Sequence, residues 1–193
     1  YMVKSGLVDD PNVSQYRLTA HLGMAVFIYS LILWTVFDLS LNYNHAMRSR
    51  IKWMSSTLTL LIFLMILSGG LVAGTRAGIP FPTWPLMGDT FIPPQIYSMN
   101  PSWLSAFEDM ATIQFNHRMF AYLLIIFIVI FAIVLLGSNV PRFLKNGTTV
   151  LLFVLSLQVV LGISTLLFYI PIPVAAAHQV GAIALLSLSL IHI

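Results

Sequence analysis

The sequence contains no cysteine and very few charged side chains. Without cysteine, the chain can form no disulfide, no zinc–thiolate site and no cofactor link through sulfur. Charged residues make up 8% of the 193 residues and apolar residues 59%, with a mean hydropathy of +0.92. A water-soluble domain of this composition could not cover its surface with polar groups, so the sequence predicts a membrane protein.

Long intervals without charge locate the membrane spans. No charge follows Lys145, but Pro171 and Pro173 cannot continue a helix and divide this last stretch in two. The five predicted spans cover residues 18–37, 53–75, 119–141, 147–169 and 174–193. Each has roughly 20 residues, enough to cross a hydrocarbon core of about 30 Å. The expected fold class is all-α, a polytopic membrane protein.

Lysine and arginine gather in two loops between the spans. The loop 42–52 carries three basic residues and the loop 138–146 carries two. By the positive-inside rule, both loops face the cytoplasm or matrix. The loop 75–114 carries Arg76 against three acidic side chains, and the five-helix count places it outside. The net charge of +3 is therefore explained by the orientation of the chain in the membrane. The sequence shows no basic patch suited to nucleic acid.

The outer loop is long for a connection without structure, so we expect it to have a role. Its first part, GIPFPTWPLMGDTFIPP, contains five prolines, which forbid a regular helix or strand. In its second part, Asn100 can cap a short helix that begins at Pro101 and places Trp103, Phe107 and Met110 on one face. This helix is expected to lie on the outer leaflet or to cover the bundle, with an ordinary anchoring loop as the alternative.

Three histidines stand at the outer ends of predicted spans. His21, His117 and His178 open the first, third and fifth spans, so their imidazoles are expected at similar depth. Small residues accompany them, including three alanines before His178 and Gly181 one turn deeper. Imidazoles that face each other from different helices, with small neighbours, are typical of haem ligation in a membrane protein. Each histidine alone could be an interfacial residue bonded to a carbonyl or water, but three at equivalent depth favour haem.

Arginines lie beside these histidines. Arg17, Arg76 and Arg118 end spans on the outer side, where they could pair with haem propionates. Anchoring of the helix ends at the interface is the alternative for each of them.

Other histidines and glycines are given structural roles. His45, in the inner basic loop, and His192, at the inner end of the last span, do not share this placement and are predicted not to be ligands. Gly70 and Gly74, spaced GxxxG, indicate close helix packing.

A weak internal sequence repeat supports a duplicated architecture. Residues 19–23 read TAHLG and residues 176–181 read AAHQVG. With a four-helix unit as the repeat, residues 53–193 form one haem-binding bundle and residues 18–41 the last helix of an earlier bundle. Residues 1–17 would be an outer segment with the tail of a preceding helix. We expect the chain to be a piece of a longer protein.

Several long stretches resemble the haem A synthases. They read YMVKSGL followed by VSQYRLTAHLG, SGGLVAGTRAG followed by TWPLMGDTFIP, QFNHRMFAYLL, and LQVVLGISTLLFYIPIPVAAAHQ. The resemblance covers the whole chain and implies the end of the third helix through the eighth of a protein built from two four-helix bundles. It implies a multi-pass oxidoreductase of the bacterial or mitochondrial inner membrane. Such an enzyme oxidises the C8 methyl of haem O to the formyl group of haem A for cytochrome oxidase biogenesis.

The resemblance also assigns roles by position. His117 and His178 match the pair that holds a haem b cofactor, while His21 matches a catalytic ligand of the substrate, haem O. The partner of His21 and the family's acidic residues are absent, so this chain alone is expected to be inactive. The implied chemistry is two hydroxylations of one methyl group followed by loss of water. Haem O and haem O synthase are candidate partners, a homo-oligomer is compatible with the sequence, and the electron donor is open.

Two other functions would use the same histidines. A di-haem b cytochrome that takes electrons from quinol would release electrons instead of a modified haem. A non-enzymatic assembly or haem-carrying membrane protein would need only binding. Haem extraction after co-expression with a haem O source separates both from a synthase.

Reporter fusions test the predicted topology. Single reporters fused after Lys52 or Lys145 should read as cytoplasmic or matrix, and one near Asp89 as outer, because basic loops stay inside. A cytoplasmic or matrix signal from the Asp89 fusion would contradict the arrangement and the shared depth of the histidines.

Overall fold

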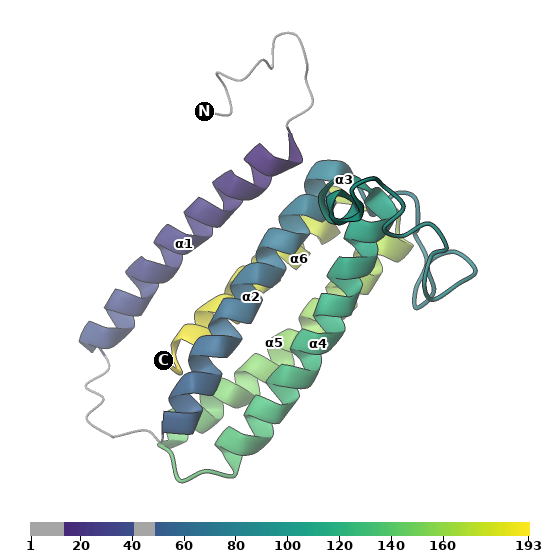
Figure 1. Ribbon diagram of the computed structural model, residues 1–193. Coiled ribbons are helices and arrows are strands. Elements are labelled where there is room, and N and C mark those ends of the chain that lie inside the picture. The colour runs from purple at the N-terminus through teal and green to yellow at the C-terminus, as the bar shows by residue number, and fades with distance from the viewer. Residues whose placement is uncertain (1–13, 41–48) are drawn as a thin grey trace.

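The computed structural model describes residues 14–40 and 49–193, and within these ranges it is helical with no β-strand (Figure 1). Five helices are long and apolar enough to cross a membrane. They are α1 (Gln15–Ser40), α2 (Ser49–Thr75), α4 (Met110–Leu136), α5 (Arg142–Leu167) and α6 (Ile172–Leu190). The chain is thus an all-α, multi-pass membrane protein, and the predicted fold class is confirmed.

Four of the helices form a bundle. Helices α2 and α5 each pack against both α4 and α6, so α4 and α6 face each other across the bundle. Buried leucine, isoleucine and phenylalanine side chains fill the centre, and Phe63 and Phe127 pack against this core from α2 and α4. Helix α1 packs on the outside of the bundle, against α2 and α6 (Figure 1).

Glycines of α2 bring α1 close. A Cβ atom on Gly74 would lie 2.7 Å from the Cα of Gln15, and one on Gly70 would lie 3.1 Å from the hydroxyl oxygen of Thr19. From the α1 side, a Cβ atom on Gly23 would lie 2.8 Å from a methyl group of Leu67. The structural role predicted for Gly70 and Gly74 is therefore confirmed, since both stand at a helix contact with no room for a side chain.

Helix α4 begins earlier than the charge pattern predicts. The expected third span began at residue 119, after Arg118, but α4 starts at Met110. Asp109 caps it, because its carboxylate accepts a hydrogen bond from the backbone N–H of Thr112 at 2.8 Å. The prediction was wrong because a charge was taken as a boundary, whereas the Arg118 side chain finds protein partners inside the helix.

The outer loop connects α2 to α4 at one end of the bundle. The predicted short helix is present as a 3₁₀ turn, η1 (Ser102–Leu104), followed by α3 (Ser105–Glu108). Two details of the prediction were wrong. The N-cap is Pro101 with no side-chain hydrogen bond, so Asn100 does not cap, and Met110 belongs to α4. The proline-rich part has no helix or strand, as expected, and contains one isolated bridge between Met87 and Thr90.

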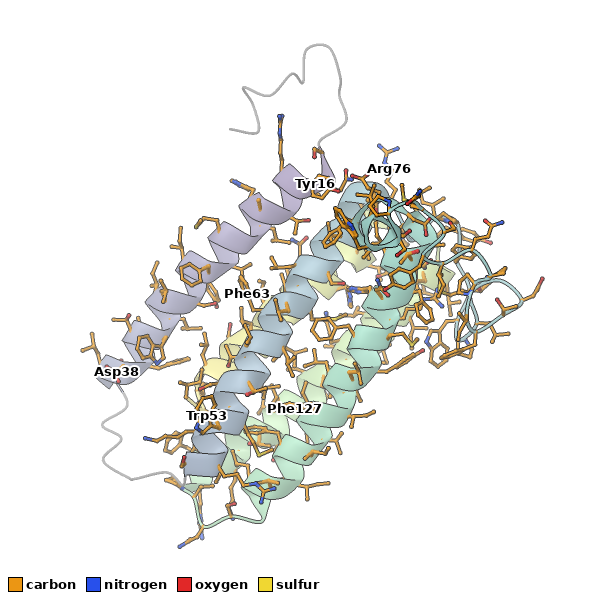
Figure 2. All side chains as sticks on the ribbon, in the orientation of Figure 1. Tyr16, Asp38, Trp53, Phe63, Arg76 and Phe127 are labelled. Carbon is orange, nitrogen blue, oxygen red and sulfur yellow. The ribbon has the colours of Figure 1, made fainter. Side chains whose placement is uncertain are left out.

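The loop end of the bundle also holds the start of α1. Figure 2 shows Tyr16 and Arg76 at this end, and Asp38 and Trp53 toward the opposite end. The Glu108 carboxylate of α3 accepts hydrogen bonds from the Gln15 side-chain amide and from the Tyr16 hydroxyl. These contacts tie the loop to α1 as well as to the bundle.

Candidate functional site

His117 lies between α4 and α2. The first turn of α4 ends at Ile113, so His117 is about two turns into the helix from its outer end. Its Nδ1 atom is hydrogen-bonded to the Ser68 hydroxyl of α2 at 3.0 Å. Gly69 follows Ser68 in α2, and a Cβ atom on it would stand 3.6 Å from Cε1 of the His117 ring. One serine and one glycine of α2 therefore hold the edge of this imidazole.

His178 lies between α6 and α5, about two turns into α6. A Cβ atom on Gly162 of α5 would stand 2.9 Å from Cε1 of the ring, closer than side chains approach. The backbone carbonyl of His178 accepts a hydrogen bond from the Gln158 side-chain amide at 2.8 Å. The Nδ1 atom of the ring is buried and has no hydrogen-bond partner among the described residues. Packing against Gly162 therefore fixes the position of the His178 ring.

These two histidines are brought together by the bundle. Helices α4 and α6 face each other across it, with His117 against α2 and His178 against α5 at a similar distance from the outer end. The arrangement is suited to a flat ligand held by two nitrogen donors, because both rings lie beside glycines and, in the described part of the chain, neither is bonded to an acid.

His21 lies apart from this pair. It occupies α1, about two turns from the outer end, and its side chain is exposed. The α1 residues that approach α2 include Gln15, Thr19 and Gly23, which lie on another face of the helix. The expected similar depth of the three histidines therefore agrees with the helix positions, but only His117 and His178 lie on helices of the four-helix bundle.

Arg118 follows His117 and points into the outer loop. Its side chain is buried, and its two terminal nitrogens donate hydrogen bonds of 2.8 to 3.5 Å to four backbone carbonyls. These carbonyls belong to Phe81, Thr83, Pro85 and Leu86. The Gln114 amide, one turn earlier, also donates to Phe81 at 3.0 Å. Only Nε of Arg118 is left without a partner in the described part of the chain.

The other two arginines lie at the same end. Arg76 follows α2 and its side chain is exposed, pointing away from the bundle (Figure 2). Arg17 lies in the first turn of α1 and is partly buried. Neither stands beside the histidine pair in the way that Arg118 does in sequence, so their expected contact with propionates stays a prediction.

His192 lies at the opposite end of the bundle and is fully buried. Its Nδ1 atom bonds to the Leu188 carbonyl at 2.9 Å, and its Nε2 atom lies 3.1 Å from the Thr148 hydroxyl. Its ring meets Phe131 edge to face with centroids 5.4 Å apart. These partners give it a packing role, while His45 lies outside the described residues.

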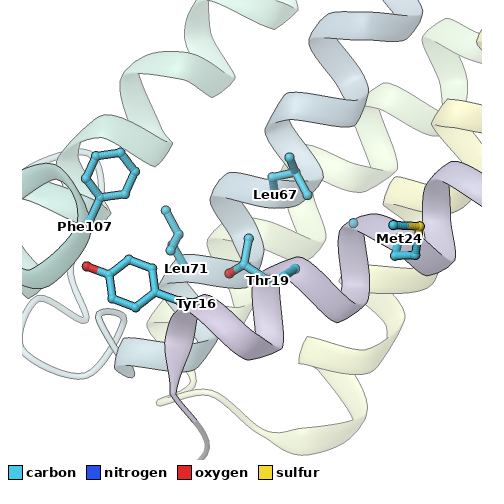
Figure 3. Close-up of a pocket in the computed structure, with 8 residues that line it drawn as sticks. Tyr16, Thr19, Met24, Leu67, Leu71 and Phe107 are labelled. Carbon is cyan, nitrogen blue, oxygen red and sulfur yellow. The ribbon is translucent and has the colours of Figure 1, made fainter. Parts of the chain in front are cut away.

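An apolar pocket opens between α1, α2 and α3 (Figure 3). Tyr16, Met24, Leu71 and Phe107 are among its lining residues. It lies against α1, and its lining residues include neither of the paired histidines. Figure 3 shows mostly hydrocarbon side chains around it, so it offers little for recognition.

Comparison with known proteins shows the family of the chain. A family model described as cytochrome oxidase assembly protein, COX15-CtaA, matches residues 1–190. The chain belongs to this family. The heme A synthase of Nitrosospira multiformis is 46% identical over 98% of this chain and 54% of its own length. The heme A synthase COX15 of Bos taurus is 39% identical over 98% of this chain and 48% of its own length. The heme A synthase of Parvibaculum lavamentivorans is 38% identical over the whole chain and 55% of its own length.

The chain spans about half the length of the curated relatives it matches. The resemblance to haem A synthases found in the motifs is confirmed by these relatives. Sequence reasoning missed Ser68, Gly162 and Gln158, which lie on helices other than those of the histidines. Ser68 belongs to the motif SGGLVAGTRAG, but no rule of sequence spacing connects it to His117, which is 49 positions away.

Removal of the Arg118 guanidinium should loosen the outer loop. Each hydrogen bond from a charged donor contributes roughly 1.5–3 kcal/mol, so Arg118→Gln should raise the rate of chymotrypsin cleavage after the exposed Phe91 by at least about tenfold. Cleavage would be followed by mass spectrometry of fragments released from the outer side of sealed vesicles. Arg142→Gln, at the inner end, is the control and should leave the rate unchanged. Equal cleavage of Arg118→Gln and the unsubstituted protein would contradict the anchoring role.

Proposed function

We propose that this chain is the haem-binding part of a haem A synthase, in which His117 and His178 would hold a haem b. The observation that carries the proposal is the placement of these two imidazoles at similar depth on helices α4 and α6, which face each other across the bundle. Neutral imidazole pairs are the usual ligands of low-spin b haems in membranes.

The residues around the pair fit such a group. Gly69 and Gly162 present no side chain to the rings, which leaves room for a macrocycle to approach the backbone. The bound haem would supply reversible one-electron chemistry. The protein would hold the two imidazoles neutral and oriented, and the outer loop anchored by Arg118 would exclude water from this end of the bundle. The Nε atom of Arg118 and the exposed Arg76 are the proposed partners of the propionates.

We place the substrate, haem O, on the outward face of α1. His21 is exposed there, on a helix that packs on the outside of the four-helix bundle. As a catalytic ligand, it would present the C8 methyl of haem O for oxidation to the formyl group of haem A. In this division, residues 18–41 belong to a substrate-side bundle and 53–193 to the haem b bundle, while the proposed tail of a preceding helix, residues 1–6, lies outside the described residues. Haem O synthase is a proposed partner that would deliver the substrate.

The alternative of a quinol-oxidising di-haem cytochrome is not supported. The relatives that match this chain carry the name heme A synthase, from bacteria to mammals. This range accords with a multi-pass protein of the bacterial or mitochondrial inner membrane.

Spectroscopy tests the haem b site. The purified protein should show the reduced α-band of a six-coordinate b haem, and either His117→Ala or His178→Ala should abolish or strongly reduce it, because a bis-imidazole site cannot form with one ligand. His45→Ala is the matched control and should leave the band unchanged. An unaltered spectrum in both single variants would refute the assignment.

The substrate site needs a separate test in a chain of the full length of the relatives. There, His21→Ala should lower haem A formation to background in cells supplied with haem O, since the substrate loses a ligand, while the haem b α-band stays. The 193-residue chain alone should hold haem b and produce no haem A. Extraction and chromatography of the haems measure both results. Normal haem A from the His21→Ala protein, or haem A from the short chain, would show that the substrate site is misplaced.

A further inference from the structure

The two paired histidines are held in different ways. The Nδ1 atom of His117 is hydrogen-bonded to the Ser68 hydroxyl at 3.0 Å. The Nδ1 atom of His178 is buried with no hydrogen-bond partner among residues 14–40 and 49–193. Packing, by contrast, restrains the His178 ring more tightly, because a Cβ atom on Gly162 would stand 2.9 Å from it and one on Gly69 would stand 3.6 Å from His117. One ring is therefore fixed by a hydrogen bond and the other by shape.

We propose that Ser68 is a positioning residue that makes His117 the stronger electron donor of the two haem ligands. This inference rests on the proposed haem b site. A neutral imidazole that gives Nε2 to a metal must carry its proton on Nδ1. In that tautomer, the Nδ1–H of His117 donates to the Ser68 oxygen, which fixes the rotation of the ring.

The direction of the electronic effect follows from this hydrogen bond. When Nδ1–H donates to an acceptor, the ring becomes more electron-rich and its Nε2 a stronger base. A stronger donor stabilises the oxidised metal more than the reduced metal, so the reduction potential falls. His178 has no such acceptor among the described residues, and therefore Ser68 is the place where this bundle can tune the potential through a ligand.

A redox titration of the purified haem protein tests the proposal. In Ser68→Ala, the midpoint potential of the b haem should shift to a more positive value, because the acceptor is removed. Ser68→Thr keeps the hydroxyl and should retain the original potential. Ser156→Ala is the matched control, since Ser156 is an exposed serine of α5 whose hydroxyl bonds to its own helix at the Leu152 carbonyl. Electron paramagnetic resonance of the oxidised haem would report the same change in ligand strength.

The outcomes separate this role from a purely structural one. An unchanged potential in Ser68→Ala would overturn the proposal, as would equal shifts in Ser68→Ala and Ser68→Thr, which would indicate packing alone. If Ser68→Ala binds no haem, binding at the original potential by Ser68→Thr supports the role of the hydroxyl, and loss of haem from both variants overturns it. Failure of the proposed function is distinct, because the unsubstituted protein would then lack a haem b whose α-band depends on His117.

Discussion

Close contact at glycine is the constraint on which the arrangement of this bundle depends. In a membrane, lipid tails are as apolar as leucine, so helices associate through close packing and hydrogen bonds rather than through exclusion of water. Gly70 and Gly74 allow α1 to lie against α2, and Gly162 allows the His178 ring to lie against α5. A methyl group at any of these positions would force helices or rings apart. The same device therefore sets the helix spacing and the position of a candidate ligand.

Polar side chains within the helices are largely satisfied locally. The hydroxyl groups of Ser55, Thr148 and Thr165 donate to backbone carbonyls four residues earlier in the same helix. Fewer polar contacts cross between helices, such as the Thr59–Ser189 pair at 2.9 Å. Because an unsatisfied polar group in hydrocarbon costs several kcal/mol, each cross-helix contact also fixes the register of the two helices it joins. The Ser68–His117 contact belongs to this smaller group.

Much of the fold could be predicted from the sequence because bilayer thickness imposes a length on apolar segments. The five spans, the irregular proline-rich loop and the short helix after Pro101 all follow from composition and from residues with restricted backbone angles. The start of α4 could not be predicted, since the pattern does not show that Arg118 would be solvated by loop carbonyls. The histidine candidates came from their placement. Their supporting residues, Ser68 and Gly162, depend on which helices become neighbours, and a single sequence does not specify that.

Arg118 has a mechanical consequence for the helix that carries it. A buried guanidinium that bonds to four loop carbonyls can neither sink toward the hydrocarbon nor rise toward water without breaking them. Helix α4 is therefore held at a fixed height in the bilayer by the outer loop. His117 precedes Arg118 directly, so a shift in the loop is transmitted to the height of that imidazole. A loop outside the membrane thus sets the depth of one of the two candidate ligands within it.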